Sequence, residues 1–293
     1  MGIMELPLVV GVDGSDGSIL AVDWAVDEAA RHNLPLRLVY GSLWEQYEGA
    51  LPSLSLQRPS ERVMAQHIVA SAEERVRRLN PDVKVSVEVV AAEAASALLS
   101  EGDNASALVI GSRGRGELKG ALLGSVGLAV AARAYCPVIV VRGDKAGLAG
   151  THRRILLGAG DPDTSHEAVR FAFREAEARG CLLDVVRSWR VPAHDNADQP
   201  APVEGPVRPE AQAADLVDTL VAEATDDHPA VRVNRVTVEG PARKVLVNRS
   251  AAADLVVVGV RRRSGHFGLQ LGRVSHTLLH HAACPVAVVP QHV

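Results

Sequence analysis

The chain has 293 residues, of which 47% are apolar and only 3% aromatic, and its formal net charge is −4. That length suits two domains of about 150 residues each better than one small core. A core so poor in aromatics must be built from Val, Leu, Ile and Ala, as in strands covered by helices on both faces. The charge excludes the strong basic field that holds nucleic acid or an anionic membrane surface.

No apolar run approaches the roughly 20 residues that span a bilayer. The N-terminus has no basic n-region, so it does not resemble a signal peptide. The three cysteines, Cys136, Cys181 and Cys284, are odd in number and widely spaced, which favours free thiols over a disulfide framework. We therefore expect a cytoplasmic protein without nucleic-acid or membrane partners.

Strand and helix patterns alternate along the first half of the chain. Apolar runs predict strands, and apolar residues at helical spacing predict helices. The expected strands are 7–12, 34–40, 83–90, 107–110 and 138–141, and the expected helices are 21–31, 58–79, 93–100 and 125–134. Such alternation indicates an α/β fold with a parallel sheet and right-handed crossovers.

The second half repeats the first. Cys136-Pro-Val-Ile-Val-Val recurs 148 positions later from Cys284, and Trp24-Ala25 meets Phe171-Ala172 at 147. Because an internal repeat determines the fold, we predict two copies of one domain, at 1–143 and 151–293. The short polar, glycine-rich stretch 142–152 is the expected linker, and the proline-rich stretch 191–209 is an expected surface loop.

The most informative segment follows the fourth predicted strand and precedes a helix. It contains Gly111, Gly114 and, further on, Gly124-Ser125-Val126. Glycines there allow backbone N–H groups to approach an anion, and the helix N-terminus adds partial positive charge. We expect Ser125 to be the N-cap. The absence of Gly-Lys-Ser/Thr excludes a P-loop, so the segment predicts nucleotide binding of another kind.

The pattern Gly111-x2-Gly114-x9-Gly124-Ser125 resembles the ATP-binding signature of the universal stress protein family. The segments Val10-Gly-Val-Asp-Gly-Ser15 and Cys136-Pro-Val-Ile-Val-Val141 support this resemblance, which covers nearly the whole chain as a tandem member. It implies two doubly wound, Rossmann-like, five-stranded parallel-sheet domains of order 3-2-1-4-5. It also implies ATP, with Mg²⁺, at the carboxyl ends of strands one and four.

The resemblance also implies site residues and partners. The implied contacts are a nucleoside-side carboxylate, a backbone contact near the adenine, and a loop around the ribose and phosphates: Asp13, Gly41, Gly111, Gly114, Gly124, Ser125 and Val126. Family members often carry a further serine where this chain has Gly127. The last strands of the two halves are expected to pair antiparallel as an internal pseudo-dimer, and two chains to form a homodimer with an unknown protein partner.

The second copy departs from the signature. Gly114 is matched by Arg262, Ser125 by Arg273, and Asp13 by Gly160 with Asp161 beside it. We therefore expect ATP to be held mainly in the first domain. The resulting hypothesis is an ATP-binding stress-response regulator or sensor with slow or no hydrolysis. The alternatives are a nucleotide-independent interaction module and, less well matched, an ATP-pyrophosphatase-like ligase.

We expect no catalytic or metal-binding role for the other candidate residues. His276, His280 and His281 lie on the last helix. The pair His276 and His280, four residues apart, could bind zinc only with a further ligand. We therefore expect solvated or capping histidines and no metal site. Ser15 and Ser18 have no neighbouring base. Arg261 begins a short basic run, expected to be a solvated loop.

Overall fold

The protein is described by a computed structural model that covers residues 6–43, 58–114, 123–162, 165–191, 208–261 and 271–291. Its first half contains β1 (Leu8–Gly11), α1 (Asp16–His32), β2 (Leu36–Gly41), α2 (Arg58–Leu79), β3 (Val85–Val90), α3 (Ala94–Gly102), β4 (Ala107–Gly111), α4 (Ser125–Arg133) and β5 (Val138–Val141). After a short helix, α5 (Lys145–Leu148), the second half contains β6 (Arg154–Gly158), α6 (His166–Arg179), β7 (Leu182–Trp189), α7 (Pro209–Asp227), β8 (Arg232–Glu239), α8 (Ala242–Ser250), β9 (Leu255–Arg261), α9 (Arg273–His281) and β10 (Val286–Gln291).

The strands form one ten-stranded sheet of order β3-β2-β1-β4-β5-β10-β9-β6-β7-β8. Each half alone has the predicted order 3-2-1-4-5, with all pairs parallel. The halves join where β5 and β10 pair antiparallel, with Ile139 opposite Ala287. The predicted fold class and the internal pairing of the last strands are therefore confirmed.

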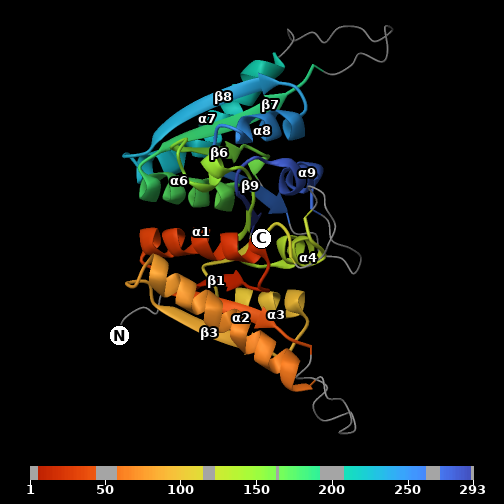
Figure 1. The fold of residues 1–293 in the computed structure, drawn as a ribbon. Helices are drawn as coiled ribbons and strands as arrows, with labels where there is room; N and C mark the ends of the chain where they lie inside the picture. The colour runs from red at the N-terminus through yellow and green to blue at the C-terminus, as the bar shows by residue number, and fades with distance from the viewer. Residues whose placement is uncertain are drawn as a thin grey trace, which may run out of the picture.

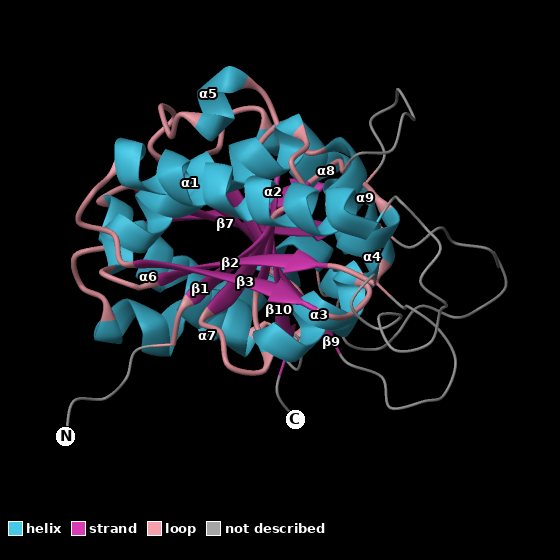
Figure 2. Cartoon of the chain, turned by 60° about the horizontal axis from the view of Figure 1, so that its bottom comes forward, coloured by secondary structure: helices cyan, strands magenta, loops and turns pink. Residues whose placement is uncertain are grey.

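Helices cover both faces of the sheet (Figure 2). One apolar core lies beneath α1, α2, α6 and α7, and the other beneath α3, α4, α8 and α9. Consecutive residues of β4 alternate between these cores, since Leu108 belongs to the second and Val109 to the first, both with no exposed surface. Aliphatic strand residues facing helices on both sides explain how the core forms with so few aromatics.

The segment expected to be a linker is docked onto the second half. Asp144 caps α5 and donates its backbone N–H to the Ala283 carbonyl at 3.0 Å. Gly143 has a φ of +112°, and a Cβ there would lie 2.2 Å from the same carbonyl. Composition suggested a flexible connection, but glycine is required here by close backbone approach. Of the expected loop 191–209, residues 192–207 lie outside the described ranges.

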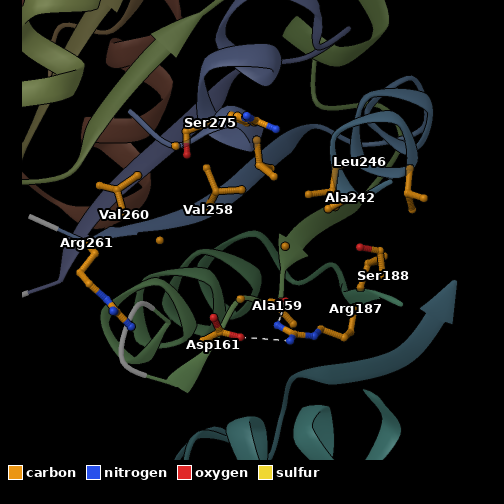
Figure 3. A pocket seen from close by; sticks show the side chains of 18 of the residues that line it. Ala159, Asp161, Arg187, Ser188, Ala242, Leu246, Val258, Val260, Arg261 and Ser275 are labelled. Atoms are coloured by element: carbon orange, nitrogen blue, oxygen red, sulfur yellow. Dashed lines mark hydrogen bonds and ion pairs between the residues drawn. The ribbon is translucent and has the colours of Figure 1, made fainter. Parts of the chain in front are cut away.

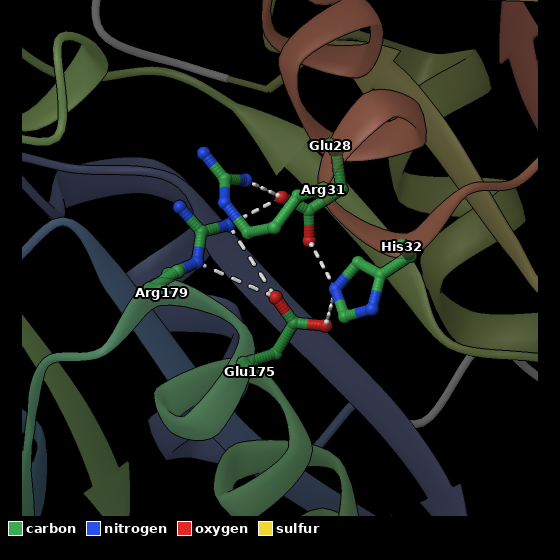
Figure 4. Close-up of polar contacts among 5 residues, drawn as sticks. All are labelled: Glu28, Arg31, His32, Glu175 and Arg179. Atoms are coloured by element: carbon green, nitrogen blue, oxygen red, sulfur yellow. Dashed lines mark hydrogen bonds and ion pairs between the residues drawn. The ribbon is translucent and has the colours of Figure 1, made fainter.

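A second contact between the halves is a buried ion-pair cluster between α1 and α6 (Figures 1 and 4). Arg179 of α6 donates to Glu28 of α1 at 2.6 Å, and His32 Nε2 lies 3.1 Å from Glu175. Arg31 also pairs with Glu28. Both carboxylates are almost fully buried, so the cations beside them compensate for lost hydration.

The members of this cluster occupy equivalent positions of the repeat, since 28 + 147 = 175 and 32 + 147 = 179. Ligand atoms of Glu28, His32 and Glu175 lie within 4.8 Å of one another, a spacing compatible with a metal ion. However, the carboxylates are already paired with the guanidiniums of Arg31 and Arg179. We therefore interpret the cluster as an ion-pair network that joins the halves.

Candidate functional site

The end of β4 meets the first turn of α1 at a contact between two glycines. A Cβ at Gly111 would lie 2.4 Å from the backbone of Gly17, and a Cβ at Gly17 would lie 2.1 Å from the Arg113 carbonyl. The segment 111–124, which contains the glycines of the predicted signature, is called the glycine loop. The first turn of α1 packs backbone to backbone against its start. Gly111 is thus required for packing whether or not a ligand is present.

Asp13 and Ser15 connect the β1 loop to the glycine loop. Asp13 Oδ1 accepts from the Ser15 N–H at 2.9 Å and from the Ser15 hydroxyl at 2.6 Å. Ser15 caps α1, and its Oγ also lies 3.3 Å from the Arg113 carbonyl. Asp13 Oδ2 lies 2.7 Å from the Cβ position of Gly114. The fold therefore brings together three of the predicted site residues, Asp13, Gly111 and Gly114.

The N-terminus of α4 lies at the other end of the glycine loop. Gly124, not Ser125, is the N-cap: its backbone is extended (φ −64°, ψ 158°) and no side chain caps the helix. The expectation for Ser125 was wrong by one residue. The helical ladder begins where Leu128 N–H donates to the Gly124 carbonyl. The first-turn N–H groups, including those of Ser125 and Val126, therefore have no partner within the helix.

The Cβ position of Gly124 at this helix end faces open space among the described residues. No heavy atom lies within 4 Å of the Cβ position of Gly124, although the neighbouring residues 115–122 are outside the described ranges. The Gly124 N–H donates to the Ser112 carbonyl at 3.2 Å, which holds the helix end against the end of β4. Partial positive charge and unpaired N–H groups at such an end suit an anion.

Gly41 ends β2 on the far side of β1 from β4. A Cβ there would lie 2.6 Å from Ala94 Cα, at the start of α3. Like Gly111, it has a packing reason to be glycine. Val126, in the first turn of α4, packs against the second core.

His280 of the second half contacts the glycine loop of the first. Its Nδ1 accepts the Leu123 backbone N–H at 3.0 Å, and the side chain is 6% exposed. Burial, together with nearby His276, His281 and Arg142, lowers the pKa of His280, which keeps the ring neutral and Nδ1 free to accept. Of the two expected roles, solvated or capping, solvation was wrong for His280, which accepts a backbone N–H next to the N-cap of α4. Sequence gave no signal for this contact, because its partners are 157 residues apart.

The second half has a cleft of about 1140 Å³ at the carboxyl ends of β6, β7 and β9 (Figure 3). Arg187 donates to the Ala159 carbonyl and to Asp161 Oδ1, both at 3.1 Å. These side chains face apolar Val258 and Leu246 across the cleft. Arg261 lines it as well, so this residue of the predicted solvated loop faces a cavity. Arg262 lies outside the described residues.

The cysteines offer no redox chemistry. All three are buried and free. Burial raises the pKa of Cys136 to about 11 and raises that of Cys284 still further. The register of β5 and β10 places these two at opposite ends of the strand pair, opposite residues 290 and 142. They are therefore packing residues, and they are free thiols as expected.

The fold and this site define a tandem Rossmann-like α/β protein with an open, glycine-capped helix end at the carboxyl edge of its sheet. The family model described as "Universal stress protein family" matches residues 6–142 and again 151–290. The chain therefore belongs to the universal stress protein family. Among the described residues, no helix is long and apolar enough to cross a bilayer.

Individual relatives agree with this assignment. The chain is 35% identical to universal stress protein Rv2005c of Mycobacterium tuberculosis, with 97% of each chain covered. It is 29% identical to universal stress protein Rv2623 of the same organism, covering 98% of this chain and 97% of that protein. A solved universal stress protein from Archaeoglobus fulgidus superposes with a TM-score of 0.71 at 17% identity, with 98% of each chain covered. That structure supports the fold.

Proposed function

We propose that this protein is a stress-response regulator or sensor that binds ATP, with Mg²⁺ on the phosphates, in its first half. The proposed contacts are those implied by the family signature: Asp13, Gly41, Gly111, Gly114, Gly124, Ser125 and Val126. Family membership supports nucleotide binding in general. We propose specifically that the nucleotide is ATP, that it binds in the first half (1–143) rather than the second (151–293), and that these residues contact it.

The observation that carries it is the N-terminus of α4, which no side chain caps. Gly124 leaves the first-turn N–H groups without a side-chain acceptor, and nothing described lies within 4 Å of its Cβ position. Arg113 is exposed at the start of the same loop. A helix end of this kind, at the carboxyl edge of a parallel sheet, accommodates phosphates.

Ser125→Glu tests the proposal with little risk to the fold. An anionic side chain in the first turn favours the helix dipole, but it repels a phosphate placed at the same end. We expect calorimetry on the full chain to show ATP binding in the wild type, weakened about tenfold or more in Ser125→Glu through charge repulsion. Ser125→Gln, which has the same shape as Ser125→Glu without the charge, should bind ATP more tightly than Ser125→Glu.

Equal affinity in Ser125→Glu and Ser125→Gln would remove α4 from the site. A second variant tests the opposite wall of the loop. In Gly114→Ala the new methyl would lie 2.7 Å from Asp13 Oδ2, so the carboxylate must move. Mass analysis of purified protein should then find less adenine nucleotide than in the wild type.

Slow or no hydrolysis is part of the proposal. Asp13 Oδ1 already accepts two hydrogen bonds from Ser15, which leaves that oxygen a poor general base. We expect phosphate release from ATP and Mg²⁺ to stay near background under conditions where binding is saturated. Multiple turnovers that disappear in an Asp13→Asn variant would contradict this.

The alternative is an interaction module that signals without nucleotide. The packing of Gly41 and Gly111 favours this alternative, because close backbone contacts explain both glycines without a ligand. Absence of ATP binding and of co-purified nucleotide would select the alternative. A cytoplasmic location, supported by three free buried thiols, and a homodimer complete the proposal. Chain mass in solution tests the homodimer.

A further inference from the structure

The cleft of the second half differs in charge from the equivalent region of the first. Among the described residues, three guanidiniums, those of Arg187, Arg261 and Arg273, and the carboxylate of Asp161 line it, which gives a formal sum of +2. Their counterparts 147 or 148 positions earlier are a tyrosine, an arginine, a serine and a glycine beside an aspartate: Tyr40, Arg113, Ser125, Gly14 and Asp13. That set sums to zero. Divergence has therefore made the second cleft basic.

The basic character continues into a neighbouring cavity of about 250 Å³. Arg273 lines both spaces, and the smaller one is also lined by Arg190 and Arg243. The described residues that line this smaller cavity include no carboxylate. Guanidiniums that line two adjoining cavities favour a ligand with several negative charges.

Arg187 changes the end of the cleft that corresponds to the predicted nucleoside side of the first half. It replaces Tyr40 (40 + 147 = 187), and its guanidinium is held by the Ala159 carbonyl and Asp161. The carbonyl at the end of β6 is therefore already an acceptor for a side chain. Next to it, Gly160 lacks the carboxylate that Asp13 provides in the first half. Contacts that would select a nucleoside are thus replaced by an ion pair between Arg187 and Asp161.

The opposite end retains an open helix N-terminus. Gly272 caps α9 without a side-chain hydrogen bond, and the helical ladder starts at His276 N–H to the Gly272 carbonyl. Arg273, the first residue of α9, is exposed there. The helix dipole and this guanidinium act on the same region of the cleft.

We propose that the second-half cleft binds a small polyanion of the polyphosphate class and recognises the phosphates rather than an attached nucleoside. The ligand could be inorganic polyphosphate or a multiply phosphorylated metabolite, since both present the same groups to the arginines. This site is separate from the ATP site proposed for the first half, and neither depends on the other.

The experiment measures binding of inorganic tripolyphosphate to the full chain carrying Ser125→Glu, which is expected to weaken phosphate binding in the first half. Calorimetry should detect one site whose affinity falls as salt is raised. Arg273→Gln should weaken binding by about 10-fold to 100-fold, the usual effect of losing a charge-assisted hydrogen bond. Arg170→Gln is the matched control, because that arginine lies on α6 outside the cleft, with 71% of its side chain exposed.

Parallel titrations with ATP and with adenosine show whether the phosphates or the nucleoside provide the affinity. The proposal expects ATP to bind the second half no more than a few times more tightly than tripolyphosphate, and adenosine not to bind. Absence of tripolyphosphate binding, equal weakening by Arg170→Gln and Arg273→Gln, or a requirement for adenosine would each overturn it. Arg187→Tyr provides a further check, because restoring the first-half residue should weaken tripolyphosphate. Loss of ATP binding in the first half alone would refute the proposed function and leave this inference intact.

Discussion

The cluster of Glu28, His32, Glu175 and Arg179 makes the stability of the folded chain depend on pH in a direction that can be measured. Hydrogen bonds to Glu175 and Glu28 raise the pKa of His32 from 6.5 to about 9. Burial and the neighbouring carboxylate raise the pKa of Glu175, while Arg179 and His32 hold the pKa of Glu28 below its usual range. The His32 side chain is only 14% exposed.

The pKa of His32 is higher in the folded chain, so the folded state binds its proton more tightly than the unfolded state. The resulting stabilisation is fully present below pH 6.5 and is lost as pH rises through 9. At 1.36 kcal/mol per pH unit, the shift amounts to about 3 kcal/mol at most. The raised pKa of Glu175 also adds stability that is lost as pH rises, but at lower pH than for His32. The lowered pKa of Glu28 adds stability that is lost as pH falls into the acid range.

Other groups titrate at the edges of the window from pH 6.5 to 9.5, because the pKa of Glu175 is raised to about 7 and burial raises the pKa of the Cys136 and Cys284 thiols. The difference between the wild type and a His32 variant in this window therefore reports His32.

The assay is urea unfolding of the wild type, His32→Gln and His67→Gln across that window. His67 is exposed on α2 and serves as the matched control. We expect the unfolding free energy of the wild type and of His67→Gln to fall as pH rises, by about 2–3 kcal/mol more than that of His32→Gln. His32→Gln should be less stable than the wild type at pH 6.5. A flat wild-type profile, or the same slope in His32→Gln, would refute the reasoning.

Three further predictions follow from packing and hydrogen bonding. Gly111→Ala places a methyl 2.4 Å from the Gly17 backbone, so it should lower the unfolding free energy by about 1–3 kcal/mol; an unchanged urea midpoint would contradict the contact. Cys136 and Cys284, with raised pKa values and buried thiols, should react with a thiol reagent only in denaturant; rapid labelling of the native chain at pH 8 would contradict their burial. Asp254 accepts the N–H groups of His152 and Arg154 at 2.9 and 3.2 Å. Asp254→Ala should therefore lower stability by about 1–3 kcal/mol in the same urea assay, and a loss below about 0.5 kcal/mol would show that these bonds are dispensable.

The order of strands was predictable because repeat and periodicity are properties of the sequence itself. The runs around Val10, Val109 and Ile139 are apolar on both faces, and the duplicated Cys-Pro-Val motif marked the joining strands. Helix starts were less predictable. The first strand ends at Gly11 and α1 begins at Asp16, earlier than the expected residue 21, because Ser15 supplies a side-chain cap that hydrophobic spacing does not reveal.

The site was predictable only where local sequence decides the geometry. Glycines and the helix after β4 could be read from the chain, but the cap fell on Gly124 because its extended backbone precedes the helix. Contacts between distant residues gave no local signal, as with Leu123 and His280. The docking of 142–152 was missed for the same reason. His32 of α1 and Arg179 of α6 occupy equivalent positions of the repeat. Their ion pairs depend on the contact between these two helices, which the sequence does not reveal.

The antiparallel joint also has a consequence for symmetry. Ile139 and Ala287 are equivalent residues of the repeat, since 139 + 148 = 287, and they face each other across β5 and β10. In a dimer of identical chains, a residue on the twofold axis meets its own copy, so Ile would meet Ile and a histidine near the axis would appear twice. Covalent fusion removes that restriction. One large side chain can oppose one small one, and a single titrating histidine can share its carboxylates with a permanently charged arginine.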